Sequence, residues 1–378
     1  MKLALVVKTS IDHDGRVISQ IDHISKEYPE MEIEIYLLSD KKYNITFKKN
    51  VKVKEIKLFS RRLPKNMFFK FFKMFEFFLK TLFKLVLFKP NLIHAHDDNA
   101  ILGPLIYKMI YKSNVILIYD DHELRNIPPC NMTEKIMFYL EKTIIKKSDL
   151  VIVANYARKR FINIIFNPKR CFIVENMCYE RNKNSLKSIT EQKIKEIKNL
   201  KRNGKKVLLH QGVINKNRKS DLIEKMIFLL PDNWVIYFIG VNTVNIPFNI
   251  DFIKDKIRFG GFIPYENLSN LWYEVDGVAM FYGTHNLNNK YCAPNRMYLA
   301  ANLGKPIISN DNPTLKKFII NNGFGVVINS SNINSQLELY FRKFEDFKYQ
   351  LIKQKNKLKF NYNSSHPIIK IYDEIINR

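Results

Sequence analysis

The chain has 378 residues, of which 46% are hydrophobic, and this length predicts two domains, each with a sizeable core. Lysine and arginine number 62 against 36 aspartates and glutamates, and the formal net charge of +26 predicts an anionic partner such as nucleic acid, a membrane surface or a phosphorylated substrate. The four cysteines form no CxxC pair, which argues against a zinc knuckle and favours a reduced, cytoplasmic protein, and the absence of about 18 consecutive uncharged apolar residues argues against a membrane-spanning helix.

Short apolar runs alternate with amphipathic stretches through the first half of the chain. The runs predict β-strands and the stretches between them predict helices; residues 134–147, for example, follow Thr133 as the expected N-cap. Strands that alternate with helices form a mostly parallel sheet covered on both faces. The expected strands are residues 3–7, 33–38, 51–58, 91–94, 115–119, 150–154 and 172–174.

The alternation stops after residue 176 and starts again near residue 206. Residues 179–205 are charged and poor in strand formers, so we expect a linker that contains a helix. The fold class is therefore α/β, with Rossmann-like domains at residues 1–178 and 206–360. The strands expected in the second half are residues 206–210, 234–240, 257–259, 277–281, 306–309 and 325–328.

Residues 67–88 combine a basic stripe with a broad apolar face. Their sequence, MFFKFFKMFEFFLKTLFKLVLF, places Lys70, Lys73, Lys80 and Lys84 at steps of three, seven and four, on one side of a helix. A helix of this kind suits an anionic membrane surface. The alternative is a helix that packs on the sheet with its lysines in water.

A polar loop follows the first strand at residues 12–17, at the sheet edge where ligands bind in open α/β folds. Gly15 would let a phosphate or a sugar approach the backbone, and Arg16 could pair with an anion. Asp12-His13-Asp14 also has DxD metal-motif spacing, although such triplets are common by chance, and the whole loop could be an ordinary turn. The absence of GxGxxG argues against a dinucleotide-binding dehydrogenase.

Two neighbouring strand ends carry polar clusters, HAHDD at residues 94–98 and DDHE at residues 120–123. One interpretation is a metal-dependent hydrolase that uses His94, His96 and His122 as ligands. The other is a polar wall that binds sugar hydroxyls. Hydrolases of the first kind recruit further ligands from later strands, where this chain offers only isolated histidines, so we favour the second.

The second half contains two candidate anion sites. His210-Gln211-Gly212 ends a strand, and Asn217-Arg218-Lys219 precedes a helix, so a glycine, basic side chains and a helix N-terminus occur together. Residues 288–296, NNKYCAPNR, open another helix, and Arg296 adds positive charge there. Taken alone, each could be a solvated basic turn.

The order and spacing of these segments resemble the family-four glycosyltransferases of the two-domain GT-B fold. The similar runs are NLIHAHDDNAIL, YDDHEL and EKTIIKKSDLVIVAN, followed by LLHQGVINKNRKSDLIEKM, FGGFIPYENLSNLWYEVDGVAMF and YCAPNRMYLAANLGKPII. The resemblance covers most of the chain. It implies two facing domains with the site in the cleft between them, and a helix at residues 361–378 that returns to the first domain.

The resemblance also implies a reaction: transfer of a sugar from a nucleotide sugar to a glycan or lipid-linked acceptor, with retention of configuration and without a metal or other cofactor. It implies catalytic roles for His122, beside the donor sugar, and for Arg218, at the diphosphate, whose negative charge grows as the nucleotide departs. The donor-binding residues would be Gly15, Gln211, Gly212, Arg218, Tyr291, Pro294, Asn295 and Arg296, and the acceptor-side residues Arg16, His96, Asp97 and Glu123.

Three alternatives stay open. Tyr291 and Leu299 stand where many family members carry glutamates, and Leu299 cannot accept a ribose hydroxyl bond, which favours an inactive scaffold of the same fold. The metal-dependent hydrolase is the second alternative. A nucleic-acid binder rests on charge alone, because no recognised nucleic-acid module is present. We expect a metal-independent enzyme of bacterial surface polysaccharide synthesis, cytoplasmic or peripheral on the inner face of the cell membrane, with no nucleic-acid partner.

Overall fold

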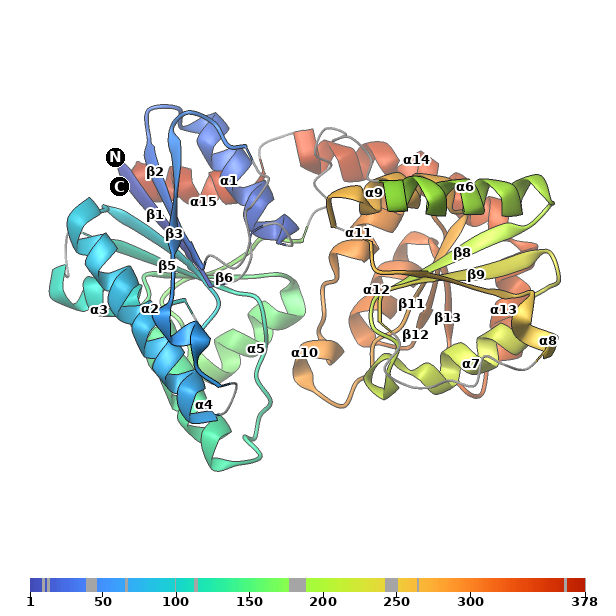
Figure 1. The fold of residues 1–378 in the computed structure, drawn as a ribbon, viewed down its shortest axis with the longest axis horizontal. Helices are drawn as coiled ribbons and strands as arrows, with labels where there is room; N and C mark the ends of the chain where they lie inside the picture. The colour runs from blue at the N-terminus through green and yellow to red at the C-terminus, as the bar shows by residue number, and fades with distance from the viewer. Residues whose placement is uncertain are drawn as a thin grey trace. The chain divides into compact units, whose positions relative to one another are not determined.

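The computed structural model describes the chain except for residues 9–10, 12–13, 39–45, 65–66, 99, 112–114, 177–187, 242–250, 264, 364–365 and 378, and some helix side chains. It divides into two compact units, drawn in Figure 1. Unit 1 consists of Met1–Asn176 with Ser365–Arg378, and unit 2 of Met177–Ser364. Each unit is an α/β domain built on its own parallel sheet.

Unit 1 contains a parallel sheet with the strand order β3-β2-β1-β4-β5-β6-β7. Its strands form where the apolar runs occur, and β1, β4, β5 and β6 are almost wholly buried. Pairing of Val7 with His96, and of His96 with Asp120, aligns the carboxyl ends of β1, β4 and β5. The strand bounds are β1 (Lys2–Val7), β2 (Glu32–Leu38), β3 (Val51–Ile56), β4 (Leu92–His96), β5 (Ile116–Asp121), β6 (Leu150–Val153) and β7 (Cys171–Ile173).

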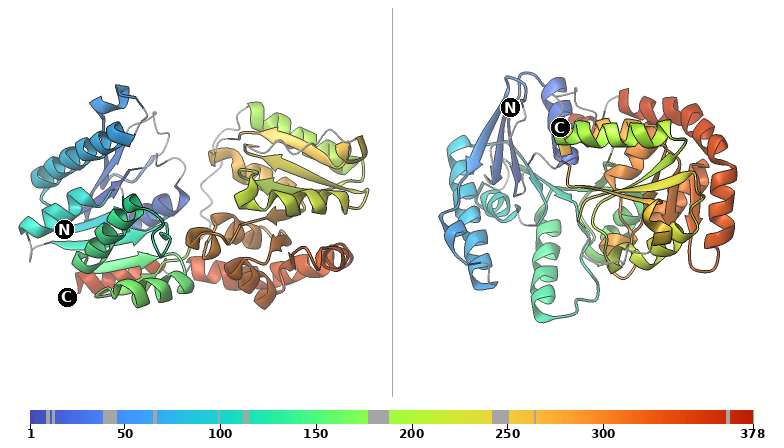
Figure 2. Two further views of the ribbon diagram at one scale, coloured as in Figure 1. Left: turned by 90° about the horizontal axis from the view of Figure 1, so that it is seen from below. Right: turned by 45° about the vertical axis from the view of Figure 1, so that its right-hand side comes forward.

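Helices cover both faces of this sheet. The right-hand view of Figure 2 shows α1 and α2 on opposite sides of the strands. The expected cap of α4 is corrected: Asn131, in an extended conformation, accepts from the Glu134 N–H at 2.9 Å, so the helix begins before Thr133. The bounds are α1 (Gly15–Glu27), η2 (Phe59–Arg62), α2 (Met67–Phe88), α3 (Leu102–Tyr111), α4 (Met132–Lys147) and α5 (Tyr156–Phe166).

The end of the chain, α15 (Pro367–Ile376), belongs to unit 1 and packs beside α1. The ring of Tyr372, which is fully buried, stacks on Tyr28 with 6.2 Å between centroids. The Tyr28 hydroxyl donates to Asp373 at 2.6 Å. The left-hand view of Figure 2 shows α15, in red, along this unit.

Unit 2 contains a parallel sheet in the order β10-β9-β8-β11-β12-β13. Buried apolar clusters lie on both of its faces. The segment expected as a linker contains α6 (Ser188–Arg202), whose Ile197 is buried in one of these clusters and whose Glu196 accepts from the Tyr237 hydroxyl at 2.7 Å. The strands are β8 (Lys206–Gln211), β9 (Trp234–Ile239), β10 (Ile257–Gly261), β11 (Gly277–Met280), β12 (Ile307–Asn310) and β13 (Gly325–Ile328).

The connections of unit 2 that bear on function are short helices at the carboxyl edge of its sheet. They are η4 (Lys216–Arg218), α10 (Leu287–Lys290) and α11 (Asn295–Asn302). The other helices are α7 (Ser220–Phe228), α8 (Asp251–Lys254), α9 (Tyr265–Glu274), α12 (Pro313–Asn322), α13 (Ile333–Arg342) and α14 (Phe344–Asn363). No helix in the described part of either unit is long and apolar enough to cross a bilayer.

Candidate functional site

A buried carboxylate, Asp120, lies at the centre of the polar cluster in unit 1. It is the last residue but one of β5 and is 0% exposed. Arg16, from the first turn of α1, donates to both of its oxygens, at 2.7 and 3.2 Å, and Gln20 donates to Oδ2 at 2.8 Å. Arg16 also donates to the Val174 carbonyl at 2.5 Å. The anion that Arg16 binds in this structure is therefore a carboxylate of the chain itself.

Three histidines surround the same oxygen of Asp120. His94 Nε2, His96 Nδ1 and His122 Nε2 lie 3.7, 3.6 and 3.7 Å from Oδ2. His94 and His96 stack with 4.3 Å between ring centroids and are buried, whereas the His122 side chain is 14% exposed. His122 is therefore the histidine that a ligand in solvent can reach.

The histidines of this cluster differ in charge. Burial lowers the pKa of His94, and it lowers that of His96 well below the usual value. Burial would also lower the pKa of His122, but Asp97 and Asp120 raise it to about 9. Burial would raise the pKa of Asp120, but Arg16 and His122 hold it well below its ordinary range. At neutral pH the cluster therefore holds a protonated His122 beside neutral histidines and an ionised Asp120.

The loop after β4 supports His122 from the other side. Asp97, at φ 65°, accepts from the His122 N–H at 3.2 Å, and its second oxygen lies 3.6 Å from His122 Nδ1. Asp14, which caps α1 immediately before Gly15, lies 3.9 Å from the same nitrogen. Glu123 is exposed next to His122 in the chain. The remaining residues of the DxD triplet, Asp12 and His13, lie outside the described part.

One group in the described part of the chain has metal-ligand spacing: His94, His96 and Asp120 offer atoms within 4.8 Å of one another. Arg16 and Gln20 already bond both oxygens of Asp120. A cation between the histidines would lie beside the Arg16 guanidinium, which would repel it. The surroundings of this group therefore disfavour a metal.

Two arginines of unit 2 converge on one tyrosine ring. The guanidinium carbon of Arg218, at the end of η4, lies 3.9 Å from the Tyr282 ring centroid. That of Arg296, in the first turn of α11, lies 5.4 Å from the same centroid, and Arg296 also donates to the Tyr282 hydroxyl. Among the described residues, neither guanidinium has a carboxylate at ion-pair distance, and Arg218 Nη1 is buried without a hydrogen-bond partner. These donors are available to an anion.

A glycine brings bare backbone against one arginine of this pair, Arg296. Gly212 follows β8 at φ +127°, and a Cβ there would lie 3.0 Å from Arg296 Nη1. Gly240, one residue beyond β9 and at φ +125°, packs so closely that a Cβ added there would lie 2.3 Å from the Gly212 carbonyl oxygen. Backbone without side chains next to a guanidinium group, with a second guanidinium on the same tyrosine ring, suits the binding of a phosphate group.

The remaining predicted residues of unit 2 have different surroundings. Gln211 accepts from the buried Trp272 indole at 2.7 Å, so its side-chain oxygen is held by the fold. Pro294 is the N-cap residue of α11, without a side-chain cap bond, and Asn295 begins that helix. Tyr291 is partly buried at the end of α10.

Sequence reasoning missed several contributors to these sites. Tyr282 lies two residues beyond β11 and Gly240 one residue beyond β9, and their positions at strand ends were the available signal. From the sequence, His210 was considered only as a neighbour of Gly212 and as one of the isolated histidines of the later strands. It is buried, and burial together with Arg296 and Arg218 lowers its pKa to about 3. This neutral histidine adds no competing charge beneath the arginines.

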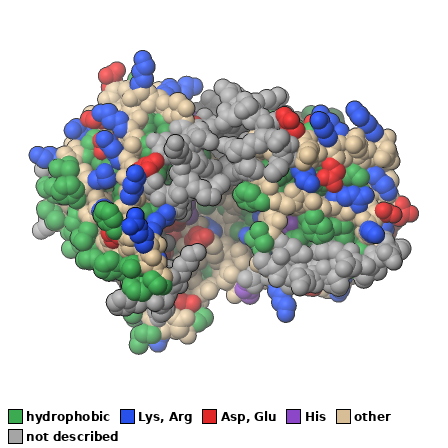
Figure 3. Space-filling view, viewed as in Figure 1, with side chains coloured by type: hydrophobic (Ala, Val, Ile, Leu, Met, Phe, Trp, Pro, Cys, Tyr) green, Lys and Arg blue, Asp and Glu red, His purple; other side chains and the backbone are tan. Residues whose placement is uncertain are grey.

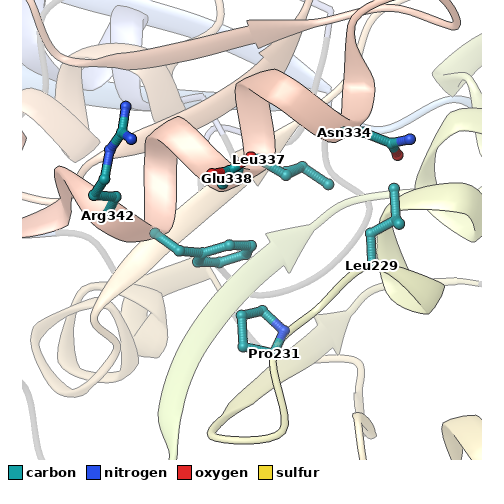
Figure 4. A pocket seen from close by; sticks show the side chains of 7 residues that line it. Leu229, Pro231, Asn334, Leu337, Glu338 and Arg342 are labelled. Carbon is teal, nitrogen blue, oxygen red and sulfur yellow. The ribbon is translucent and has the colours of Figure 1, made fainter.

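A separate cavity of about 460 Å³ opens between the end of α7 and α13 (Figure 4). None of the predicted site residues lines it. Its lining is Leu229, Pro231, Asn334, Leu337, Glu338, Phe341 and Arg342.

No protein-family model matches the sequence, and no curated protein matches it. Solved structures match nearly all of it. A sucrose-phosphate synthase from Thermosynechococcus elongatus aligns with a TM-score of 0.72 at 11% identity, over 100% of this chain and 99% of that one. Anabaena HepE in complex with UDP and glucose aligns with a TM-score of 0.65 at 14% identity, over 100% and 98%. A UDP-GlcNAc 2-epimerase from Methanocaldococcus jannaschii aligns with a TM-score of 0.54 at 14% identity, over 89% and 92%.

At these identities the likeness establishes the fold. The expectation of Rossmann-like GT-B domains is confirmed, as is the resemblance to glycosyltransferases at the level of the fold.

Proposed function

We propose that this chain is a glycosyltransferase that takes its sugar from a nucleotide-sugar donor. The observation that carries the proposal is the pair of guanidinium groups, Arg218 and Arg296, that converge on the Tyr282 ring, with Arg296 against the bare backbone of Gly212. Unit 2 is then the donor domain and unit 1 the acceptor domain. HepE, which was solved with UDP and glucose, supports the same class of ligand.

The arginines have a chemical role in this reaction. When the sugar leaves, negative charge develops on the departing diphosphate, and preorganised donors stabilise that charge. Arg218 Nη1, buried and without a partner in the described part of the chain, gains its hydrogen bond from the phosphate. The reaction retains configuration and uses no metal or cofactor, and a leaving-phosphate oxygen takes the acceptor proton. Tyr291, Pro294 and Asn295 lie near the sugar and its phosphates.

In unit 1, His122 contacts the sugar, and Asp97 and Glu123 form the acceptor side. Arg16 and His96 are 6% and 1% exposed. We therefore assign these two residues to supporting His122 through Asp120, in place of the direct acceptor contact expected from sequence. Gly15, which opens α1 beside Asp14, keeps its expected role of allowing close approach to the backbone.

The acceptor is a glycan or lipid-linked molecule at a membrane surface. The outward face of α2 carries Phe72, Phe75 and Phe83, which are 53%, 55% and 65% exposed, so these rings are not packed on the sheet. Figure 3 shows hydrophobic side chains gathered over α2 and α3. A basic, apolar surface of this kind binds lipid interfaces. The enzyme then works on the inner face of the cell membrane in surface polysaccharide synthesis.

The lysines of α2 were expected to form one basic stripe that faces a membrane, but in the structure two of them bind groups of the chain itself. Lys73 donates to the Leu63 carbonyl at 2.9 Å, and Lys80 donates to the Lys57 carbonyl at 2.6 Å and pairs with Glu76 at 2.7 Å. The side chain of Lys70 lies outside the described part. The exposed rings, rather than free lysines, therefore carry most of the proposed membrane affinity.

Thermal shift with a panel of nucleoside diphosphates and nucleotide sugars tests the donor site, because a ligand that binds only the folded state stabilises it. We expect at least one to stabilise the wild type and to lose its effect in Arg296→Ala. Arg342→Ala is the matched control, since it removes an exposed arginine of unit 2 outside the site. Equal stabilisation of all three proteins would contradict the proposal. Interconversion of nucleotide sugars without an acceptor would favour an epimerase, and binding without turnover would favour a scaffold.

A further inference from the structure

The backbone of Tyr282 is fixed by one amide side chain of the neighbouring strand. The Tyr282 N–H donates to Asn310 Oδ1 at 2.8 Å, and Asn310 Nδ2 donates to the Tyr282 carbonyl at 2.8 Å. Asn310 is the last residue of β12, which pairs with β11, and it is 1% exposed. Because one buried amide bonds both backbone groups of Tyr282, the sheet sets the point from which the Tyr282 side chain leaves the backbone.

The side chain of Tyr282 contacts both guanidinium groups, and it does so in different ways. The guanidinium carbon of Arg218 lies 3.9 Å from the ring centroid, where the negative face of an aromatic ring attracts a cation. Arg296 lies farther from the centroid, at 5.4 Å, and donates to the Tyr282 hydroxyl. The ring therefore holds Arg218, and the hydroxyl holds Arg296.

The two arginines need such a contact because their like charges repel each other. In the described part of the chain, no carboxylate lies at ion-pair distance from either guanidinium. The neighbouring polar side chains supply no negative charge, since Asn310 is an amide and burial, together with Arg296 and Arg218, lowers the pKa of His210 to about 3. Without the Tyr282 ring, the two long side chains would separate and take up several conformations.

We propose that Tyr282, fixed by Asn310, is a positioning residue that gathers Arg218 and Arg296 on one ring before any ligand binds, so that a single diphosphate meets both guanidinium groups. Tyr282 acts on the ligand through these two arginines. The identity of the ligand rests on the proposed glycosyl transfer, but the placement of the arginines can be measured without a ligand.

Arginines that are already gathered bind a diphosphate more tightly than free ones. Ordering a long side chain during binding costs affinity, and for two arginines this cost corresponds to at least about tenfold weaker binding. Arg218 Nη1 is buried and has no hydrogen-bond partner in the described part of the chain. The contact with Tyr282 therefore leaves this donor for a phosphate oxygen.

The test measures the reactivity of single arginines in the full-length protein without ligand. Phenylglyoxal modifies accessible guanidinium groups, and mass spectrometry gives the rate at each arginine. In the wild type we expect Arg218 to react at least about threefold more slowly than the exposed Arg342. Tyr282→Leu, which removes the ring, should abolish this protection. Tyr282→Phe, which keeps the ring and removes the hydroxyl, should accelerate the modification of Arg296 and leave Arg218 protected.

Tyr237→Leu is the matched control for the loss of a buried tyrosine. Tyr237 belongs to the same apolar cluster as Tyr282, but its hydroxyl donates to Glu196. This variant should leave the reactivity of Arg218 unchanged. Asn310→Ala should release Arg218 from the ring in part. Asn332→Ala should not, although it also removes an amide that bonds a backbone N–H, at 2.7 Å, and a backbone carbonyl, at 3.4 Å.

The positioning role is overturned if Arg218 reacts as fast as Arg342 in the wild type, or if Tyr237→Leu and Tyr282→Leu expose Arg218 equally. An equal acceleration at Arg218 and Arg296 in Tyr282→Phe overturns it too, so the test does not depend on Tyr282→Leu folding.

Calorimetry with UDP and with inorganic pyrophosphate separates this role from the proposed function. We expect UDP to bind the wild type and to bind Tyr282→Leu at least about tenfold more weakly; equal affinity would overturn the positioning role. If neither probe binds the wild type, while Arg218 is protected there and released in Tyr282→Leu, the donor-site proposal fails and the positioning role stands.

Discussion

Gly240→Ala should damage both the stability of unit 2 and its phosphate site. The added Cβ would lie 2.3 Å from the Gly212 carbonyl oxygen and 2.7 Å from its carbon, so the backbone of Gly212 must move. Gly240 also has φ +125°, which costs a residue with a side chain about 1–3 kcal/mol. Overpacking against fixed backbone adds about 1–3 kcal/mol. We expect the free energy of unfolding to fall by about 3 kcal/mol.

Tryptophan fluorescence during urea unfolding measures this loss for unit 2 alone. Both tryptophans of the chain, Trp234 and Trp272, are buried in that unit. Gly204→Ala is the matched control, because Gly204 has φ +76° but no atom within 4 Å of an added Cβ. It should lose only about 1 kcal/mol.

Gly240→Ala should also weaken the binding of nucleoside diphosphate at least about tenfold, because the backbone of Gly212, which it displaces, lies against Arg296. Gly204→Ala should bind as the wild type does. If Gly240→Ala is as stable as Gly204→Ala, the packing of β8 against β9 does not restrict Gly212, and the reasoning is refuted.

Three further predictions concern other parts of the chain. Tyr372→Phe removes the hydroxyl that bonds His94 Nδ1 at 3.0 Å, so it should lower the free energy of unfolding by about 1–3 kcal/mol in urea titrations followed by far-UV circular dichroism; no change would mean that His94 finds another partner. Burial lowers the pKa of His210 to about 3, so the contribution of the neutral imidazole to the free energy of unfolding is complete above pH 6.5 and is lost as the pH falls towards 3. At pH 5 the free energy of unfolding of the wild type should have fallen by about 2 kcal/mol more than that of His210→Asn, a variant that keeps a donor for the Ala279 carbonyl. Parallel pH profiles of the free energy of unfolding for the two proteins would contradict this. Phe83→Ser should reduce flotation with anionic vesicles more than the buried, conservative Phe77→Leu does, and equal flotation would remove α2 from the membrane account.

Much of the fold could be predicted because buried parallel strands leave a strong pattern in the sequence. Each expected apolar run overlaps a strand of the described structure. The ends of β4 and β5 were predicted two residues short, because His96 and Asp121 look like loop residues. They continue the strands because polar groups of the neighbouring elements form hydrogen bonds with the polar side chains at this edge of the sheet, most clearly where Arg16 donates to Asp120.

The candidate sites were less predictable, because the sequence does not show which polar groups satisfy one another. Arg16 was expected to bind a ligand, but it lies within reach of Asp120, 104 residues away. Likewise, Tyr372 reaches His94 across 278 residues. Gly212 and the start of α11 suggested the two arginines as anion-binding residues. No local sequence motif marks Tyr282, whose ring both guanidinium groups contact.

The most direct test of glycosyl transfer is the release of nucleoside diphosphate from nucleotide sugars, measured with the wild type, Arg218→Ala and Arg342→Ala. The account predicts release by the wild type from at least one donor, and a loss of at least about 100-fold in Arg218→Ala, because a preorganised donor to the leaving diphosphate is removed. Arg342→Ala should match the wild type. Release that is unchanged in Arg218→Ala, or no release by the wild type from any donor, would contradict the central claim.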